Sequence, residues 1–279
     1  MQMTLPSRKP HTADHSGFTL IEILMVLMLI AIMSTLGIEL IADSTNEAKF
    51  EETLSRMRQV QNAMIGDPNI REAGIRTSFG FLGDIGAIPT AAQGIAALTA
   101  QPAPALPVYA INATVRFGFG WNGPYLSQSS TGLDYTQDGW GRTYTYSPAA
   151  NPPTFVSLGA DGAVGGTGFN QDITFTLSNE LRTTTVNGFI CDNAGPFTGA
   201  NAQVEMNYPN GAAVLTQSLA TLTAVDKGKF SFASVPLGVR SITAYIPSKA
   251  GATTTVGPVL ITVDRPNYVV PCNQLDINP

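Results

Sequence analysis

The sequence predicts an α+β protein in which a long N-terminal helix packs on a small β-containing globular domain, and an all-β sandwich follows. Three observations carry this prediction. An apolar run at residues 18–38 continues into an amphipathic stripe that ends at residue 65. Residues 66–180 consist of short segments broken by Gly, Pro and Asn. Residues 183–279 are rich in Thr, Val, Ile and Phe, with a turn every eight to twelve residues.

The helix is expected to span residues 18–65 in two halves. The first half, residues 18–38, is apolar apart from Glu22 and a few small polar side chains. Its 21 residues would span about 31 Å, the hydrocarbon thickness of a bilayer. The second half carries an amphipathic stripe and is expected to end before a Gly-Asp-Pro break. The stripe consists of Phe50, Leu54, Met57, Val60 and Met64.

Residues 1–17 are predicted to be a leader that is removed. The string Gly17-Phe18-Thr19-Leu20-Ile21-Glu22 resembles the prepilin processing site shared by type IV pilins and type II secretion pseudopilins. The resemblance implies that a prepilin peptidase cuts after Gly17 and that Phe18 is N-methylated. An ordinary secretory signal would instead be cut beyond the apolar run, near Ser34, Gly37 or Ala42.

Glu22 is a carboxylate inside an apolar helix, which costs about 2.5–3.5 kcal/mol on insertion scales unless the charge finds a partner. The family resemblance implies one: the free α-amine of Phe18, in the same subunit or in a neighbour of a helical filament. Glu22 is therefore predicted to act in assembly. The alternative is a plain membrane anchor in which Glu22 reaches the headgroups.

Residues 66–180 resemble the globular domain of the major pseudopilin of type II secretion. Four motifs follow one another in that family's order. They lie at residues 88–98 (Pro-Thr, Gln-Gly, Ala-Leu), 121–126 (Gly-Pro-Tyr-Leu), 138–146 (Asp-Gly-Trp-Gly) and 157–173 (Leu-Gly-Ala-Asp-Gly to Asn-Gln-Asp-Ile). The aromatic residues among them are expected to pack a small sheet and show no cofactor signature. These are Trp121, Trp140, Tyr144 and Tyr146.

The resemblance also implies one structural calcium ion in the last of these motifs. The matching ligands are the side chains of Asp161, Gln171 and Asp172 and the carbonyls of Leu158 and Ala163. Oxygen-only ligands in a flexible glycine-rich loop suit this hard cation. Gln171 stands where the family has an acid, and the loss of this negative charge should weaken calcium binding. The alternative for Asp161-Gly162 is a tight β-turn with a solvated carboxylate.

The C-terminal hundred residues extend beyond that family's pattern. Strands are predicted at residues 186–190, 202–206, 229–232, 241–245 and 259–263. The pattern Gly-Lys-Phe-Ser-Phe at residues 228–232, followed by Val-Pro-Leu-Gly at 235–238, resembles the carboxypeptidase-regulatory-like sandwich. That resemblance implies an accessory or binding module.

Cys191 and Cys272 are the only cysteines of the sequence, and both lie in this module. Because the module is expected outside the cytoplasm, we predict a disulfide between them. It would close a loop of about 81 residues and contribute about 4 kcal/mol. The alternative is two buried free thiols.

Composition argues against catalysis and against nucleic acid. The net charge is −5, only 13% of residues are charged, and no basic cluster offers phosphate contacts. His11 and His15 are the only histidines, and both lie in the leader. The processed chain therefore lacks the usual general base and zinc ligand, so we predict that it is not an enzyme.

The predicted function is a structural subunit of a periplasmic pseudopilus that supports type II secretion of folded proteins. It would sit in the inner membrane by a single span, with its C-terminal domains in the periplasm. The implied partners are further copies of the chain, minor pseudopilins, the inner-membrane secretion platform and the prepilin peptidase. The alternative is a type IV pilin or minor pilin that displays a C-terminal binding or adhesion domain. An enzyme on a membrane anchor is the third, weakest hypothesis.

Overall fold

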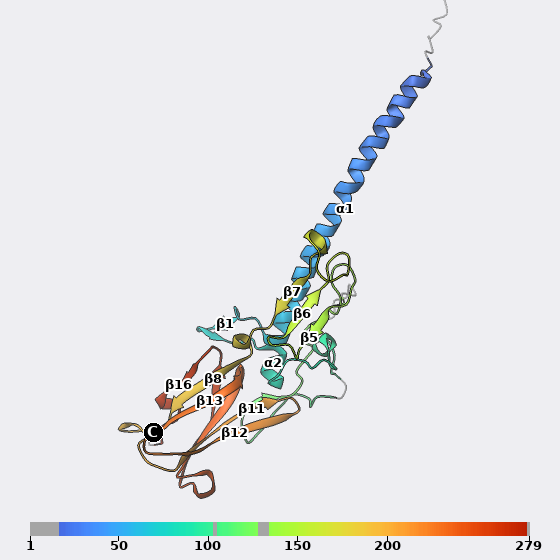
Figure 1. Ribbon diagram of the computed structural model, residues 1–279. Coiled ribbons are helices and arrows are strands. Elements are labelled where there is room, and N and C mark those ends of the chain that lie inside the picture. Colours follow the sequence, from blue (N-terminus) through green and yellow to red (C-terminus); the bar gives the residue numbers. More distant parts are fainter. Residues whose placement is uncertain (1–16, 103–104, 128–133, 278–279) are drawn as a thin grey trace, which may run out of the picture. The chain divides into compact units, whose positions relative to one another are not determined.

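The computed structural model describes residues 17–102, 105–127 and 134–277, leaving out the side chains of residues 35–42 and 218–220. The chain divides into two compact units, Met1–Glu47 and Ala48–Pro279. Residues 1–16 of the predicted leader, including His11 and His15, lie outside the described residues. The predicted α+β class is confirmed: one long helix and a few short ones accompany many strands (Figure 1).

Helix α1 (Leu20–Ile65) has 46 residues, begins two residues after the predicted start and ends at the predicted residue. The apolar stripe of its second half packs into the core: Met57, Val60 and Met64 are fully buried. Within the described part of the chain, no helix is both long enough and apolar enough to cross a membrane.

The segment after α1 contains short elements that surround a small antiparallel sheet, β5-β6-β7. The first elements are β1 (Arg71–Glu72), β2 (Ile75–Arg76), α2 (Gly80–Ile85), η1 (Ile95–Leu98), β3 (Ala110–Ile111) and β4 (Gly118–Phe119). The sheet strands and two 3₁₀ turns are β5 (Thr145–Ser147), β6 (Thr154–Ser157), η2 (Gly168–Asn170), β7 (Ile173–Thr176) and η3 (Asn179–Leu181).

The aromatic residues of this segment pack as predicted. The rings of Tyr144 and Phe155 meet edge to face, with centroids 6.1 Å apart. The indole of Trp121 donates a hydrogen bond of 2.9 Å to the carbonyl of Ala97, and its ring lies edge to face with Tyr125. These polar contacts and ring pairs are those of packing residues.

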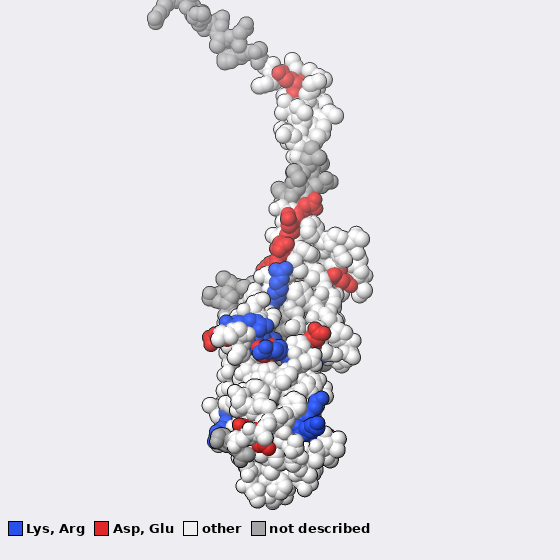
Figure 2. Space-filling view, turned by 90° about the vertical axis from the view of Figure 1, so that its left-hand side faces the viewer, with Lys and Arg blue, Asp and Glu red and all other residues white. Residues whose placement is uncertain are grey.

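The C-terminal segment forms two larger sheets and a short two-stranded sheet, β9-β10. One has four antiparallel strands in the order β12-β11-β14-β15, and the other has three in the order β13-β8-β16, in which β16 runs parallel to β8. The bounds are β8 (Thr183–Phe189), β9 (Cys191–Asp192), β10 (Gly195–Pro196), β11 (Ala202–Asn210), β12 (Ala213–Leu222), β13 (Lys229–Pro236), β14 (Gly238–Ile246), η4 (Lys249–Gly251), β15 (Thr254–Val263), β16 (Tyr268–Val270) and η5 (Cys272–Gln274). Figure 2 shows that charged side chains are few on the face in view.

Strand β12 has no counterpart among the predicted strands. It follows β11 through a two-residue turn, Gly211 and Ala212, because Asn210 pairs with Ala213. The φ of Gly211 is 67°, which is the left-handed conformation that such hairpin turns require. Asn210-Gly211 is itself a strong hairpin signal, so the sequence contained the information for this strand.

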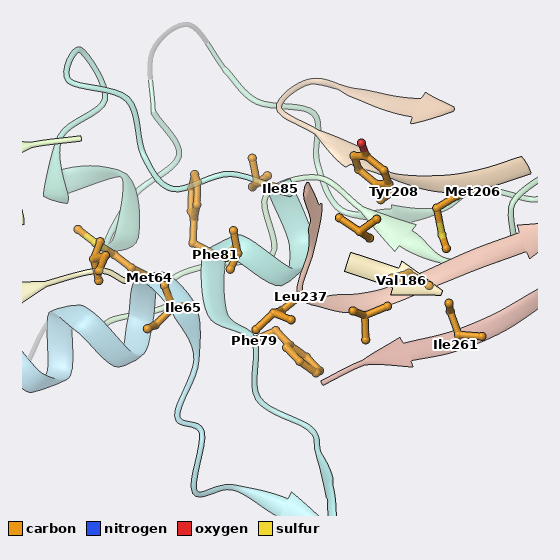
Figure 3. Packing of buried hydrophobic residues seen from close by; sticks show 14 of the residues in the cluster. Met64, Ile65, Phe79, Phe81, Ile85, Val186, Met206, Tyr208, Leu237 and Ile261 are labelled. Atoms are coloured by element: carbon orange, nitrogen blue, oxygen red, sulfur yellow. The ribbon is translucent and has the colours of Figure 1, made fainter. Parts of the chain in front are cut away.

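The middle segment and the sandwich share one hydrophobic cluster. Figure 3 shows Phe81 and Ile85 of α2 between Met64 and Ile65 of α1 and the sandwich residue Tyr208, and Phe79 beside Leu237 of the sandwich. Gly86, which ends α2 with φ 76°, lies so close to β11 that an added Cβ would be 1.7 Å from the carbonyl oxygen of Pro209.

Two buried arginines form hydrogen bonds at the boundary between the middle segment and the sandwich. Arg240 of β14 is fully buried, and its guanidinium donates a hydrogen bond of 3.0 Å to the carbonyl of Gly83 in α2. Arg76 of β2 donates from its guanidinium to the carbonyls of Ile65 and Gly66, at the end of α1. Its backbone N–H donates to the carboxylate of Asp264, just after β15, at 3.4 Å. These bonds satisfy buried polar groups across the boundary, so the two segments are joined by more than the peptide chain.

Candidate metal loop and N-terminal processing segment

The loop at residues 158–172 connects β6 to β7, whose strands pair with Ser157 opposite Ile173. It therefore brings Leu158 and Asp172, the first and last predicted ligands, to adjacent strand ends. The loop folds onto itself: the N–H of Ala160 donates to the carbonyl of Phe169 at 2.8 Å, and that of Asp172 to the carbonyl of Gly165 at 3.2 Å.

Glycine is needed where the two arms of the loop approach. Gly159 has φ 63°, and an added Cβ would lie 2.8 Å from the carbonyl oxygen of Phe169. A side chain there would both strain the backbone and push the arms apart.

The two acids of the loop differ in their surroundings. Asp161 is exposed, and one of its oxygens accepts from the N–H of Ala163 at 3.0 Å, the geometry of an Asx turn. Asp172 is half-buried: its Oδ2 accepts from the N–H of Gly165 at 3.1 Å, while its Oδ1 is buried without a hydrogen-bond partner. A buried carboxylate oxygen left unpaired costs free energy, and a cation would satisfy it.

The other predicted ligands are compatible with a cation but are partly engaged. The carbonyl of Leu158 accepts from the N–H of Gly162 at 3.2 Å and keeps a second lone pair. Gln171 and Ala163 are exposed. Among the described residues, no three His, Cys, Asp or Glu side chains group as a metal site. A metal here would therefore depend on two acids, an amide and backbone carbonyls, a donor set that fits calcium.

The sequence did not reveal the network that supports this loop. Asp138 is buried, and its Oδ1 accepts from the N–H groups of Trp140 and Arg142, both at 2.9 Å. Its Oδ2 accepts from the hydroxyl of Ser157 at 2.6 Å, and the Arg142 guanidinium donates to the carbonyl of Gly159 at 2.9 Å. The sequence signal for this network is an Asp in a loop, because its side chain can accept from the N–H groups two and four residues later and form an Asx-type turn.

The processing segment lies just before α1. Gly17, Phe18 and Thr19 are not helical, and all three are exposed. Thr19 caps the helix: its carbonyl accepts from the N–H of Glu22 at 3.0 Å, and its hydroxyl accepts from the same N–H at 3.3 Å. Thr-x-x-Glu is the sequence of a capping box, a signal that the sequence offered. Glu22 thus lies in the first turn, where the helix dipole favours a negative charge.

Cys191 of β9 and Cys272 of η5 are joined by a disulfide, with Cα atoms 5.4 Å apart. Backbone hydrogen bonds join the two segments that the disulfide connects. The N–H of Cys191 donates to the carbonyl of Leu275, and the N–H of Ile277 donates to the carbonyl of Cys191. Residues 275–277 are thereby attached beside β9.

Two family models match the chain. The model of the type II secretion system (T2SS), protein G, matches residues 80–176, and the prokaryotic N-terminal methylation motif matches residues 13–38. A search of the curated proteins found no match. The first match runs from α2 to the end of β7, so it includes the candidate metal loop and excludes the sandwich. The matched family is a structural part of the secretion system and not an enzyme. Residues 80–176 are therefore similar to protein G of the type II secretion system, and residues 13–38 are similar to the prokaryotic N-terminal methylation motif.

Proposed function

We propose that the chain is a structural subunit of a periplasmic pseudopilus, which polymerises through the first half of α1 and supports type II secretion of folded proteins. The observation that carries the proposal is the apolar surface of that half-helix. Its large apolar side chains from Leu20 to Met33 are between 49% and 83% exposed. A continuous apolar surface of this kind is stable only against lipid or against other helices.

The same surface supports a place in the inner membrane, as a single span. Arg8 and Lys9 of the leader would stay in the cytoplasm, and residues 48–279 would lie in the periplasm. A prepilin peptidase would then cut between Gly17 and Phe18, in the exposed, non-helical segment before α1. Minor pseudopilins and the inner-membrane secretion platform would be the further partners.

Replacing Glu22 tests the assembly role. Glu22→Gln keeps the shape of the side chain and removes the charge that would pair with the Phe18 amine in a neighbouring subunit. We expect the variant to be inserted and cleaved after Gly17, as shown by the mass of its N-terminus, but to form no filaments under overexpression. The matched control is Glu51→Gln, an exposed carboxylate further along α1. Normal filaments from Glu22→Gln would contradict the proposal.

We also propose that residues 158–172 bind one calcium ion through Asp161, Gln171, Asp172 and the carbonyls of Leu158 and Ala163. The unpaired Oδ1 of Asp172 supports this. Calcium at about one hundred times its Kd should stabilise the fold by about 2.7 kcal/mol, visible as a higher Tm. Asp172→Asn should abolish the rise, and Gln171→Asp should increase it. Asp226→Asn, in an exposed turn of the sandwich, serves as control. A Tm independent of calcium would contradict the site.

The alternative, a type IV pilin or minor pilin that displays the sandwich, is favoured by one observation: the sandwich lies outside the matched domain. Imaging of cells that express the chain separates the two functions. Long surface fibres would favour the displayed sandwich. Loss of secretion on deletion, without such fibres, would favour the pseudopilus.

A further inference from the structure

A cavity of about 570 Å³ lies between α2, the β3–β4 hairpin and the start of β14, away from the metal loop. Its lining includes the carboxylate of Asp84, the side chains of Tyr109, Tyr125 and Asn122, and the sandwich residue Val239. The cavity therefore needs both the matched domain and the sandwich.

Asp84 is half-buried and lacks a close cation. The hydroxyl of Tyr125 donates to its Oδ2 at 3.0 Å, and the N–H of Asn122 donates to that same hydroxyl at 3.0 Å. Among the described residues, no ion pair includes Asp84. Arg240 is the cation behind it, but its guanidinium is engaged by the carbonyls of Gly83, Pro236, Leu237 and Val239.

The negative charge of the Asp84 carboxylate is therefore only partly offset by its neighbours. Burial raises the pKa of Asp84 to about 6, although the Tyr125 hydrogen bond, the Arg240 charge and Asn122 all act to lower it. The same carboxylate contributes to raising the pKa values of Tyr109 and Tyr125, behind the larger effect of their own burial. An added positive charge in the cavity would offset the cost of burying this carboxylate.

The walls suit a cation on an aliphatic stem. Phe117 and the two tyrosines supply aromatic rings around the space, and such rings attract cations. The ring of Phe79, which also lines the cavity, already contacts the Arg76 guanidinium, 5.2 Å from its centroid. At the rim, Ile111 is 73% exposed and Val239 is 42% exposed, so methylene groups can pack there.

We propose that this cavity binds an alkylammonium group, as carried by a lysine side chain or a free primary amine, with Asp84 as its counter-ion. Tyr109 and the neighbouring rings surround the ammonium, and the apolar rim holds the stem. Arg116, exposed at the rim, is the one lining residue whose charge competes with the ligand.

Binding to the full chain in detergent tests the proposal, with Nα-acetyl-lysine methylamide as probe and its Nε-acetylated form as the neutral control. We expect saturable binding of the charged probe at about pH 7.5, at least tenfold weaker binding of the neutral one, and a tenfold loss near pH 5, where Asp84 is protonated. Butylamine identifies the source: equal affinity indicates a free amine, and weaker affinity indicates a lysine within a polypeptide.

Three variants separate the site from the fold. Asp84→Asn should lose the charged probe, and Tyr109→Ala, at a partly exposed position, should weaken it without unfolding the chain. Arg116→Ala should bind more tightly because a competing charge is removed. Equal affinity for both probes, no change with pH, or no saturation at about 50 mM would overturn the proposal. None of these outcomes depends on filament formation, so the test is separate from that of the pseudopilus.

Discussion

Three carboxylates of the folded unit show how local partners determine what an acid can do. Asp138 is buried, but two N–H groups and a hydroxyl satisfy it, so its role is to hold a turn. Asp172 has one buried oxygen without a partner, and Asp84 has hydroxyl and amide partners but no ion pair among the described residues. Only the latter two leave a negative charge that a ligand could neutralise.

Asp84 should make stability depend on pH in a defined direction. Its pKa in the folded state, about 6, lies above the ordinary aspartate value of 3.8, so the folded state holds the proton more tightly. The free energy of unfolding therefore falls as pH rises from about 4 to about 6, by up to about 3 kcal/mol for a shift of this size. Asp84→Asn should remove this slope in urea unfolding. Glu51→Gln, on the exposed side of α1, should leave it intact; an unchanged slope in Asp84→Asn would refute the assignment.

At the residue scale, the sequence predicts which side chains can act as ligands better than it predicts which residues surround them in the fold. The acids of the candidate metal loop can be named because their spacing resembles that of a known loop. Asp84 could not be named from the sequence, because its surroundings include Tyr125, 41 residues away, and Val239 from the sandwich. The cap at Thr19 is different, because its Thr-x-x-Glu signal is entirely local.

Helix α2 depends on a glycine at its end for two reasons that a matched pair of variants can separate. Gly86 and Gly74 both have positive φ, 76° and 82°, so alanine at either site costs about 1 kcal/mol of backbone strain. Only at Gly86 would the new Cβ meet a backbone atom, the Pro209 carbonyl oxygen at 1.7 Å, whereas nothing lies within 4 Å at Gly74. Gly86→Ala should therefore lower the free energy of unfolding by about 3 kcal/mol or more. Equal losses in the two variants would show that β11 does not press on α2.

The Cys191–Cys272 bond should stabilise the sandwich chiefly through the unfolded chain, because it closes a loop over 81 residues. The double variant Cys191→Ser, Cys272→Ser should lose about 4 kcal/mol in denaturant unfolding. Mass analysis without reductant reports the bond in the native protein directly. Two free thiols in periplasmic material would contradict it.

Elements with strong periodicity were predictable, and those defined by pairing were less so. The ends of α1 were placed to within two residues because a Gly-Asp-Pro break and a continuous apolar pattern mark them. Strand β8 alternates buried and half-buried residues, which is the period of two. Strand β16 has three residues and exists only because it lies parallel to β8, a contact that no local pattern encodes.

The whole folded unit is expected to unfold as one. Ala48–Pro279 is a single compact unit, and its hydrophobic cluster extends from α1 into both sheets of the sandwich. Trp121 and Trp140 are the only tryptophans and lie in the matched domain, whereas most strand residues lie in the sandwich. Tryptophan fluorescence and far-ultraviolet circular dichroism should therefore give the same urea midpoint. Two separate midpoints would show that the sandwich folds independently.

Arg76 gives the sandwich a mechanical connection to the C-terminal end of α1. The Arg76 guanidinium donates to the carbonyls of Ile65 and Gly66 at the end of α1, and the Arg76 backbone N–H donates to the carboxylate of Asp264. A load applied to the sandwich, for example by cargo pressed against it, therefore reaches the end of α1 across two hydrogen-bonded contacts and need not pass through the β5-β6-β7 sheet.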